Sequence, residues 1–181
     1  MTEAIKLALK LQLLTAQRKG EVIAAQWEDF DLAAKVWTIP AEKAKNGLSH
    51  RVPLSPQALD LLSHIKRLSG DSPYLFPSPR IGYITPTAVD HAVRRNLLVF
   101  GIKHFTPHDL RRTAASHMTG ALGIFRLVVS KILNHVEAGV TSVYDRHSYD
   151  LDKQKALEAW GARLEQLLEA DTPSVIYLKR R

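Results

Sequence analysis

Residues 106–118 read Thr-Pro-His-Asp-Leu-Arg-Arg-Thr-Ala-Ala-Ser-His-Met, a polar and basic stretch that predicts a helix. The Thr106-Pro107 pair is typical of a helix start, because proline is tolerated in the first turn. On that helix His108 and Arg111 are one turn apart and share a face. An imidazole beside a guanidinium suits phosphate binding, because arginine offers a planar bidentate fork and histidine can also transfer a proton.

The His-x-x-Arg spacing alone is not specific. It also occurs at His64 with Arg67 and at His91 with Arg94, a risk of chance matching that any short motif carries. The surrounding charge is more informative. The chain has a net charge of +7, and residues 91–135 contain seven of the 25 basic residues, one acidic residue and five of the eight histidines. This segment favours an anionic partner such as nucleic acid. A solvated basic face is the alternative.

The composition is that of an ordinary globular chain. Its 181 residues fit one domain, with 45% hydrophobic and 24% charged residues. The absence of cysteine excludes disulfides and cysteine-ligated zinc or iron–sulfur sites. No apolar run approaches the roughly 20 residues of a membrane span. The first residues lack the basic-then-apolar pattern of a signal peptide. We therefore expect a cytoplasmic protein that does not bind membranes.

The hydrophobic pattern predicts a mainly α fold with a small antiparallel β-sheet (α+β). Apolar residues at Leu7, Leu11 and Leu14 mark one face of the first helix. Two short apolar stretches flank Asn46-Gly47, a tight-turn signal, and predict a β-hairpin. The expected helices are 4–14, 21–26, 55–65, 85–100, 106–118, 125–133 and 157–167, and the expected strands are 35–40, 51–54 and 174–178.

Further residues with chemical potential stand in a fixed order around the 106–118 stretch. Arg18 lies 90 residues before His108, Lys45 lies in the predicted hairpin, and His135 and Tyr144 follow. This series resembles the catalytic domain of the tyrosine recombinases of the phage integrase family over about residues 15–149. In that family an arginine, a hairpin lysine, a His-x-x-Arg pair, a histidine or tryptophan and a tyrosine nucleophile occur in this order at comparable intervals.

The resemblance implies a role for each matched residue. The implied catalytic residues are Arg18, Lys45, His108, Arg111, His135 and the nucleophile Tyr144, with Glu21 in a supporting position. They imply cleavage and rejoining of DNA through a covalent 3′-phosphotyrosine, with no metal or other cofactor. Two guanidiniums can neutralise the charge that develops on the phosphate, each donor contributing roughly 3 kcal/mol. Tyrosine has a pKa of about 10 and needs a base such as His108 or cationic surroundings. Lys45 is the expected acid for the leaving 5′-oxygen.

Two of these assignments have a rival close by in the sequence. Lys43 competes with Lys45 for the role of general acid. Tyr149 competes with Tyr144 for the role of nucleophile, although the nine-residue spacing from His135 favours Tyr144.

Other matched positions have a structural alternative. Arg18 alternatively caps the end of the first helix, and His135 caps a later one. The family often has glycine where Ala16 and Asn134 stand, so both departures concern the local backbone rather than a reacting group. The side chains expected to pack rather than react are Trp27, Trp37, His117 and Trp160, the last in this or a neighbouring subunit, while Arg112 is expected to make a structural or DNA-backbone contact.

The family pattern also bears on domain organisation. Family members usually carry an N-terminal core-binding domain, and only 17 residues precede Arg18 here. We therefore expect residues 1–181 to form a single catalytic domain that binds DNA weakly and recombines poorly alone. The tail, residues 172–181, is expected to dock on a neighbouring subunit. The implied partners are a double-stranded recombination site and other recombinase subunits assembled on it. The implied origin is a bacterial or phage-encoded, nucleoid-associated protein.

Three other functions compete with this reading. A non-catalytic DNA-binding module would need only the basic segment 91–135. A type IB topoisomerase would use similar strand-transfer chemistry. A metal-dependent hydrolase would use His104, His108, Asp109 and His135, but Pro107 prevents the first two from lying regularly on one helix.

Overall fold

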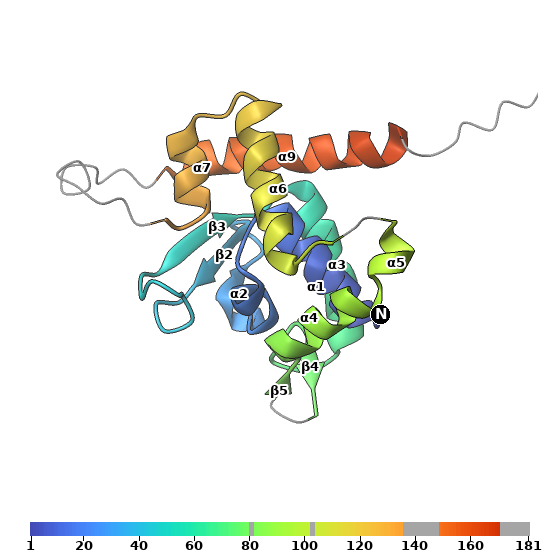
Figure 1. The fold of residues 1–181 in the computed structure, drawn as a ribbon. Coiled ribbons are helices and arrows are strands. Elements are labelled where there is room, and N and C mark those ends of the chain that lie inside the picture. Colours follow the sequence, from blue (N-terminus) through green and yellow to red (C-terminus); the bar gives the residue numbers. More distant parts are fainter. Residues whose placement is uncertain (80–81, 102–103, 136–148, 171–181) are drawn as a thin grey trace, which may run out of the picture.

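The computed structural model describes residues 1–79, 82–101, 104–135 and 149–170. In this part of the chain the fold is mainly α-helical with two small antiparallel sheets, which confirms the predicted class (Figure 1). The helices are α1 (Glu3–Thr15), α2 (Lys19–Ile23), the 3-10 turn η1 (Trp27–Asp29), α3 (Pro56–Ser69), α4 (Pro86–Arg95), α5 (Leu97–Phe100), α6 (Pro107–Gly120), α7 (Arg126–Ile132) and α9 (Asp150–Ala170). The strands are β1 (Phe30–Asp31), β2 (Val36–Ile39), β3 (His50–Pro53), β4 (Pro77–Ser78) and β5 (Gly82–Tyr83).

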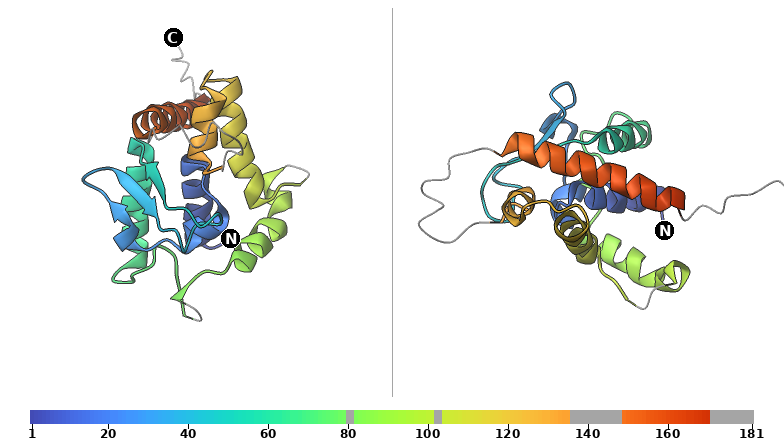
Figure 2. Two further views of the ribbon diagram at one scale, coloured as in Figure 1. Left: turned by 90° about the vertical axis from the view of Figure 1, so that its left-hand side faces the viewer. Right: turned by 90° about the horizontal axis from the view of Figure 1, so that it is seen from above.

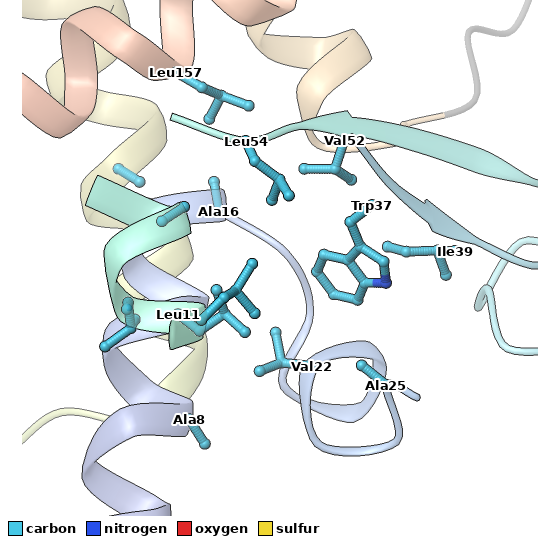
Figure 3. Close-up of a cluster of buried hydrophobic side chains, with 14 of the residues drawn as sticks. Ala8, Leu11, Ala16, Val22, Ala25, Trp37, Ile39, Val52, Leu54 and Leu157 are labelled. Carbon is cyan, nitrogen blue, oxygen red and sulfur yellow. The ribbon is translucent and has the colours of Figure 1, made fainter. Parts of the chain in front are cut away.

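Helix α1 lies at the centre of the molecule and contacts α2, α3, α6 and α9. Its apolar residues recur at helical spacing, so that Leu7, Ala8 and Leu11 are buried on the inner face. Figure 3 shows Leu11 among the side chains that α2, the sheet and α9 contribute to the same core. The central position of α1 places its C-terminal end, and the residues that follow it, next to α6 and α7.

The predicted β-hairpin is confirmed, with one more strand than the sequence indicated. The sheet order is β1-β2-β3, and Trp37 on β2 faces Val52 on β3. Trp37 and Ile39 alternate inward and are both buried (Figure 3), and Phe30 of β1 stacks on Trp37 at a centroid distance of 5.2 Å. The connection between β2 and β3 spans residues 40–49 and is longer than a two-residue turn.

Helix α9 crosses the molecule and contacts α7, α3, α1, α6 and β3 (Figure 2). Trp160 is buried and its Nε1 donates to Leu13 O at 2.8 Å. The ring of His117 lies 5.6 Å from that of Trp160. Both side chains therefore pack within this subunit. At the start of the helix Lys153 Nζ donates to Arg51 O at 2.8 Å, which ties α9 to β3.

Several predicted helices have different limits in the structure. The last, expected over 157–167, runs from Asp150 to Ala170, and the one expected over 55–65 ends at Ser69. The helix expected over 85–100 breaks at Asn96, whose Nδ2 donates to Ala92 O at 2.8 Å. Such a side chain competes with the helical backbone for its hydrogen-bonding groups. The helix expected over 21–26 runs from Lys19 to Ile23 with Gly20 inside it, because the Glu21 carboxylate accepts from the backbone N–H of Arg18 at its N-terminus.

The nucleophile expected at Tyr144 and the tail expected at 172–181, with its strand 174–178, lie outside the described residues. Among the residues that the structure does describe, no helix is long and apolar enough to cross a membrane.

Candidate active site

The C-terminal end of α7 is the point where several distant segments meet. The last carbonyls of a helix have no partner within it and carry partial negative charge. Here the carbonyl of Ile132, the last residue of α7, and those of the next two residues accept hydrogen bonds from side chains of four other segments. Gln17 Nε2 and His50 Nε2 reach Ile132 O, both at 3.0 Å, Arg111 Nη2 reaches Leu133 O, and Asn46 Nδ2 and Arg18 Nη2 reach Asn134 O at 3.1 and 3.5 Å. We call the carbonyls of residues 132–134 and these five side chains the carbonyl cluster.

Arg111 is the most buried member of the predicted set, with 3% of its surface exposed. Its second guanidinium nitrogen donates to Ala16 O at 2.7 Å, so the side chain spans the end of α1 and the end of α7. Burial, and next the positive charge of Arg18, lower the pKa of Arg111 to about 10, while Glu21 opposes the change. The guanidinium therefore stays charged at neutral pH and has three of its five N–H groups left for another acceptor.

Arg18 caps α2 rather than α1. Its Nη1 lies 2.9 Å from Glu21 Oε1, and its backbone N–H donates to Glu21 Oε2 at 3.1 Å. The Glu21 carboxylate is almost fully buried, whereas the Arg18 side chain is 23% exposed. The predicted Arg18–Glu21 association is thus present as a direct ion pair that leaves part of the guanidinium open to solvent.

The two predicted histidines flank this pair of arginines. His108 is exposed in the first turn of α6, one turn from Arg111, and His135 is exposed directly after α7. Partial burial, followed by the positive charges of Arg111, Arg18 and His108, lowers the pKa of His135. The charges of Arg111, Arg18 and His108 thus all act on the His135 imidazole and favour its neutral form.

The two candidate lysines differ in whether a carboxylate pairs with their charge. Lys43 Nζ lies 2.9 Å from both carboxylate oxygens of the buried Asp29, which ties it to the protein. Lys45 is exposed and lines an open groove of about 410 Å³ together with Arg18 and His108. Lys43 also borders this groove, but its charge is already neutralised by a carboxylate, so Lys45 is the better placed of the two to meet a phosphate.

Both departures from the family pattern fall on left-handed backbone. Ala16 has φ 55° and Asn134 has φ 47°, a region that glycine enters freely and other residues enter at a cost. The backbone path that a glycine would favour is therefore kept with alanine and asparagine. At Ala16 it turns the carbonyl toward Arg111.

Asp109, one of the residues considered as a metal ligand, has a structural role in this fold. Asp109 caps α6 by accepting from Thr106 N at 2.9 Å and Thr106 Oγ1 at 2.8 Å, and these bonds lower the pKa of its carboxyl. Within the described ranges no group of three or more histidine, aspartate or glutamate side chains is placed to hold a metal ion.

Tyr149, the rival of Tyr144, immediately precedes α9. Its backbone carbonyl accepts from Lys153 N at 2.8 Å, and Lys131 Nζ lies 5.1 Å from the centre of its ring. It does not border the groove that Arg18 and His108 line.

Sequence reasoning missed the neutral members of the carbonyl cluster. Gln17 and His50 are buried and stand next to predicted elements, but no motif marks them. Asn46 was interpreted only as a turn residue. The available signal was indirect: His50 is a polar residue at the start of the apolar strand β3, and a buried polar side chain needs a hydrogen-bond partner.

The chain belongs to the phage integrase family, whose family model matches residues 2–150. It is 32% identical over 172 residues to the prophage integrase IntA of Escherichia coli K12, a match covering 91% of this chain and 39% of that protein. The chain thus spans about two fifths of the length of the curated relatives that it matches.

Solved structures with the same fold come from the same family. The integrase of mycobacterium phage Brujita aligns with a TM-score of 0.70 at 18% identity, covering 87% of this chain and 52% of that one. A lambda integrase dimer bound to a COC′ core site aligns with a TM-score of 0.62 at 20% identity, covering 81% of this chain and 43% of that one. The mainly α architecture is therefore the tyrosine recombinase catalytic fold.

Proposed function

We propose that this chain is the catalytic domain of a site-specific DNA recombinase that cleaves and rejoins double-stranded DNA through a covalent 3′-phosphotyrosine. One observation carries the proposal. Arg18 and Arg111, from distant parts of the chain, both donate to carbonyls at the end of α7, and Arg18, Lys45 and His108 line one groove. Tyr144 stands nine residues after His135. A group of cationic side chains suits attack by a tyrosine on a phosphodiester.

The proposed reaction exchanges one phosphoester for another. The Tyr144 hydroxyl oxygen attacks phosphorus and forms a P–O bond, while the bond from phosphorus to the 5′-oxygen breaks. His108 accepts the phenol proton, and Lys45 donates a proton to the leaving 5′-oxygen. Rejoining is the reverse attack by a 5′-hydroxyl, so the bond energy is kept and no cofactor is consumed. Arg18 and Arg111 stabilise the charge on the non-bridging oxygens throughout.

The exposed charge supports DNA as the substrate. Arg94, Arg95, Arg112 and Arg126 of the basic segment are all exposed, and Arg111 is the buried exception. Exposed cations of this kind contact the DNA backbone and make binding depend on salt. The lambda integrase with the same fold is described as a dimer on its core site. We propose by analogy that copies of this chain assemble on double-stranded DNA, at the nucleoid, with residues 172–181 docking between subunits.

The test is covalent trapping. The chain is incubated with a library of nicked duplexes with randomised central base pairs, and protein–DNA adducts that resist denaturation are collected. We expect an adduct that forms in the presence of EDTA and is lost in Tyr144→Phe but kept in Tyr149→Phe.

Each other outcome is informative. No adduct from the unaltered chain would favour a DNA-binding module without catalysis. An adduct that is lost in Tyr149→Phe instead would move the nucleophile. Loss in EDTA would revive a metal-dependent reaction. Relaxation of supercoiled DNA without joining of two duplexes would favour topoisomerase-like activity.

A further inference from the structure

The loop between β2 and β3 is joined to the end of α7 by two asparagines. Asn46 Nδ2 donates to Asn134 O at 3.1 Å, and Asn134 Nδ2 donates back to Asn46 Oδ1 at 3.2 Å. The two residues are 88 positions apart and both are partly buried. Two reciprocal amide bonds therefore connect segments that no backbone pairing connects.

The backbone at Asn134 makes this contact possible. With φ 47° the residue adopts a conformation that glycine enters freely and that asparagine tolerates better than most residues. A glycine there would keep the backbone path and the carbonyl but would lose the side-chain donor. Asn46 in turn also accepts from Leu48 N at 3.2 Å, so the same amide closes a turn within the loop.

The pair lies between groups to which the proposed function gives roles. Lys45 precedes Asn46 in the chain, and His135 follows Asn134. Arg18 Nη2 lies 3.5 Å from the same Asn134 carbonyl that Asn46 contacts. Lys45 itself is exposed and borders the groove that Arg18 lines. The position of Lys45 relative to the arginine therefore depends on how the loop is attached to α7.

We propose that Asn46 and Asn134 are positioning residues that hold the loop of residues 40–49 against α7 and thereby place Lys45 to protonate the leaving 5′-oxygen. This inference rests on the proposed strand-transfer function. Its physical basis is the steep dependence of catalysis on geometry, since a displacement of about 1 Å can cost roughly 100-fold in rate.

The test separates positioning of the acid from general damage. Cleavage rates are measured under single turnover at saturating DNA, on the best-cleaved duplex recovered from the trapping library. The duplex is used in two forms, with oxygen or with sulfur as the 5′-bridging atom. A thiol has a pKa of about 8.5, so sulfur leaves without an acid. We expect Asn134→Gly and Asn46→Ala to slow cleavage of the oxygen form about tenfold or more. Cleavage of the sulfur form should be within about twofold of the unaltered protein, as for Lys45→Ala.

A second measurement does not depend on activity. Hydrogen exchange of the loop amides is compared without DNA in the unaltered protein and in Asn134→Gly. This variant leaves the Gly47 N to Ala44 O bond of 3.0 Å in place, so faster exchange reports release of the loop. Asn96→Ala is the matched control, because it also removes one hydrogen bond that an asparagine side chain donates, here to Ala92 O at the end of α4. We expect exchange at least threefold faster in Asn134→Gly and unchanged in Asn96→Ala.

The outcomes distinguish this inference from the proposed function. If the unaltered protein forms no adduct on either duplex, the proposed function fails, and exchange still decides whether the pair holds the loop. If the unaltered protein cleaves and both variants cleave the oxygen form equally fast, the inference fails and the function stands. Equal slowing on oxygen and sulfur, or unchanged exchange, also overturns it.

Discussion

His50 should make the fold sensitive to acid. Its imidazole is 6% exposed and donates to Ile132 O in the carbonyl cluster. Burial first, then the charge of Lys153 and that of Arg111, lower its pKa from 6.5 to about 4, against the opposing effects of the Ile132 hydrogen bond and Glu21. The folded protein therefore keeps His50 neutral in a pH range where the unfolded chain protonates it.

The sign and size follow from proton linkage. Between pH 6.5 and about 4 the unfolded state binds the extra proton, so the free energy of unfolding falls as the pH falls. Each unit of pKa difference is worth about 1.36 kcal/mol. The change from 6.5 to about 4 therefore corresponds to a maximum loss of roughly 3 kcal/mol of unfolding free energy. About 2 kcal/mol of this should already be lost between pH 7.5 and pH 5. The dependence fades above pH 6.5, as the unfolded chain also loses its proton.

The assay is urea unfolding followed by circular dichroism at about pH 7.5 and pH 5. His50→Gln is the matched variant, because its amide can still donate to Ile132 O but does not titrate in this range. The unaltered protein should lose about 2 kcal/mol more than His50→Gln on acidification. Equal losses would refute the reasoning. If the variant does not fold, the pKa of His50 measured by NMR decides, and a value near 6.5 refutes it equally.

Three further changes have outcomes set by local contacts. Ala16→Gly should cost about 1–2 kcal/mol less in unfolding free energy than Ala8→Gly, because glycine relieves left-handed strain only at position 16; equal costs would contradict this. Lys43→Ala should destabilise the protein by about 1–3 kcal/mol by leaving a buried carboxylate unpaired. Lys45→Ala should stay within about 0.5 kcal/mol by the same urea unfolding. Arg111→Lys should cost about 1–3 kcal/mol, because one amine cannot reach both carbonyls that the guanidinium spans. If Arg111→Lys unfolds at the same temperature as the unaltered protein, one of those two bonds contributes nothing to stability.

Local pattern was enough to predict most of the elements. The helix starts at Pro56, Pro86 and Pro107 are where the proline rule places them. The hairpin was predicted from the apolar stretches around Asn46-Gly47, and the predicted strands already left residues 41–50 between them. The contacts of this loop with other segments were not predicted, because their partners lie far away in the sequence. The break at Asn96 was missed because one side-chain bond outweighs an otherwise helical pattern.

The candidate site was predictable only where a family pattern marks a residue. Arg18, His108 and Arg111 were expected near one another; Arg18 and His108 line one groove, and Arg18 and Arg111 donate to neighbouring carbonyls at the end of α7. Gln17 and His50 were not expected, because their partners lie 115 and 82 positions away and contacts at that range leave no periodic trace in the sequence. The sequence does not show which carbonyl each of these two side chains contacts, because only folding brings the partner close.

The carbonyl cluster has a thermodynamic consequence for any phosphate that binds there. The Arg111 guanidinium is fixed by two carbonyls, and that of Arg18 by a carboxylate and a third carbonyl, without any ligand. Freezing an arginine side chain costs about 2 kcal/mol of rotamer entropy. For these two side chains that entropy is lost when the protein folds. A phosphate of the proposed DNA substrate would therefore meet donors that are already ordered, and more of its binding free energy would remain available for bending or unpairing that DNA.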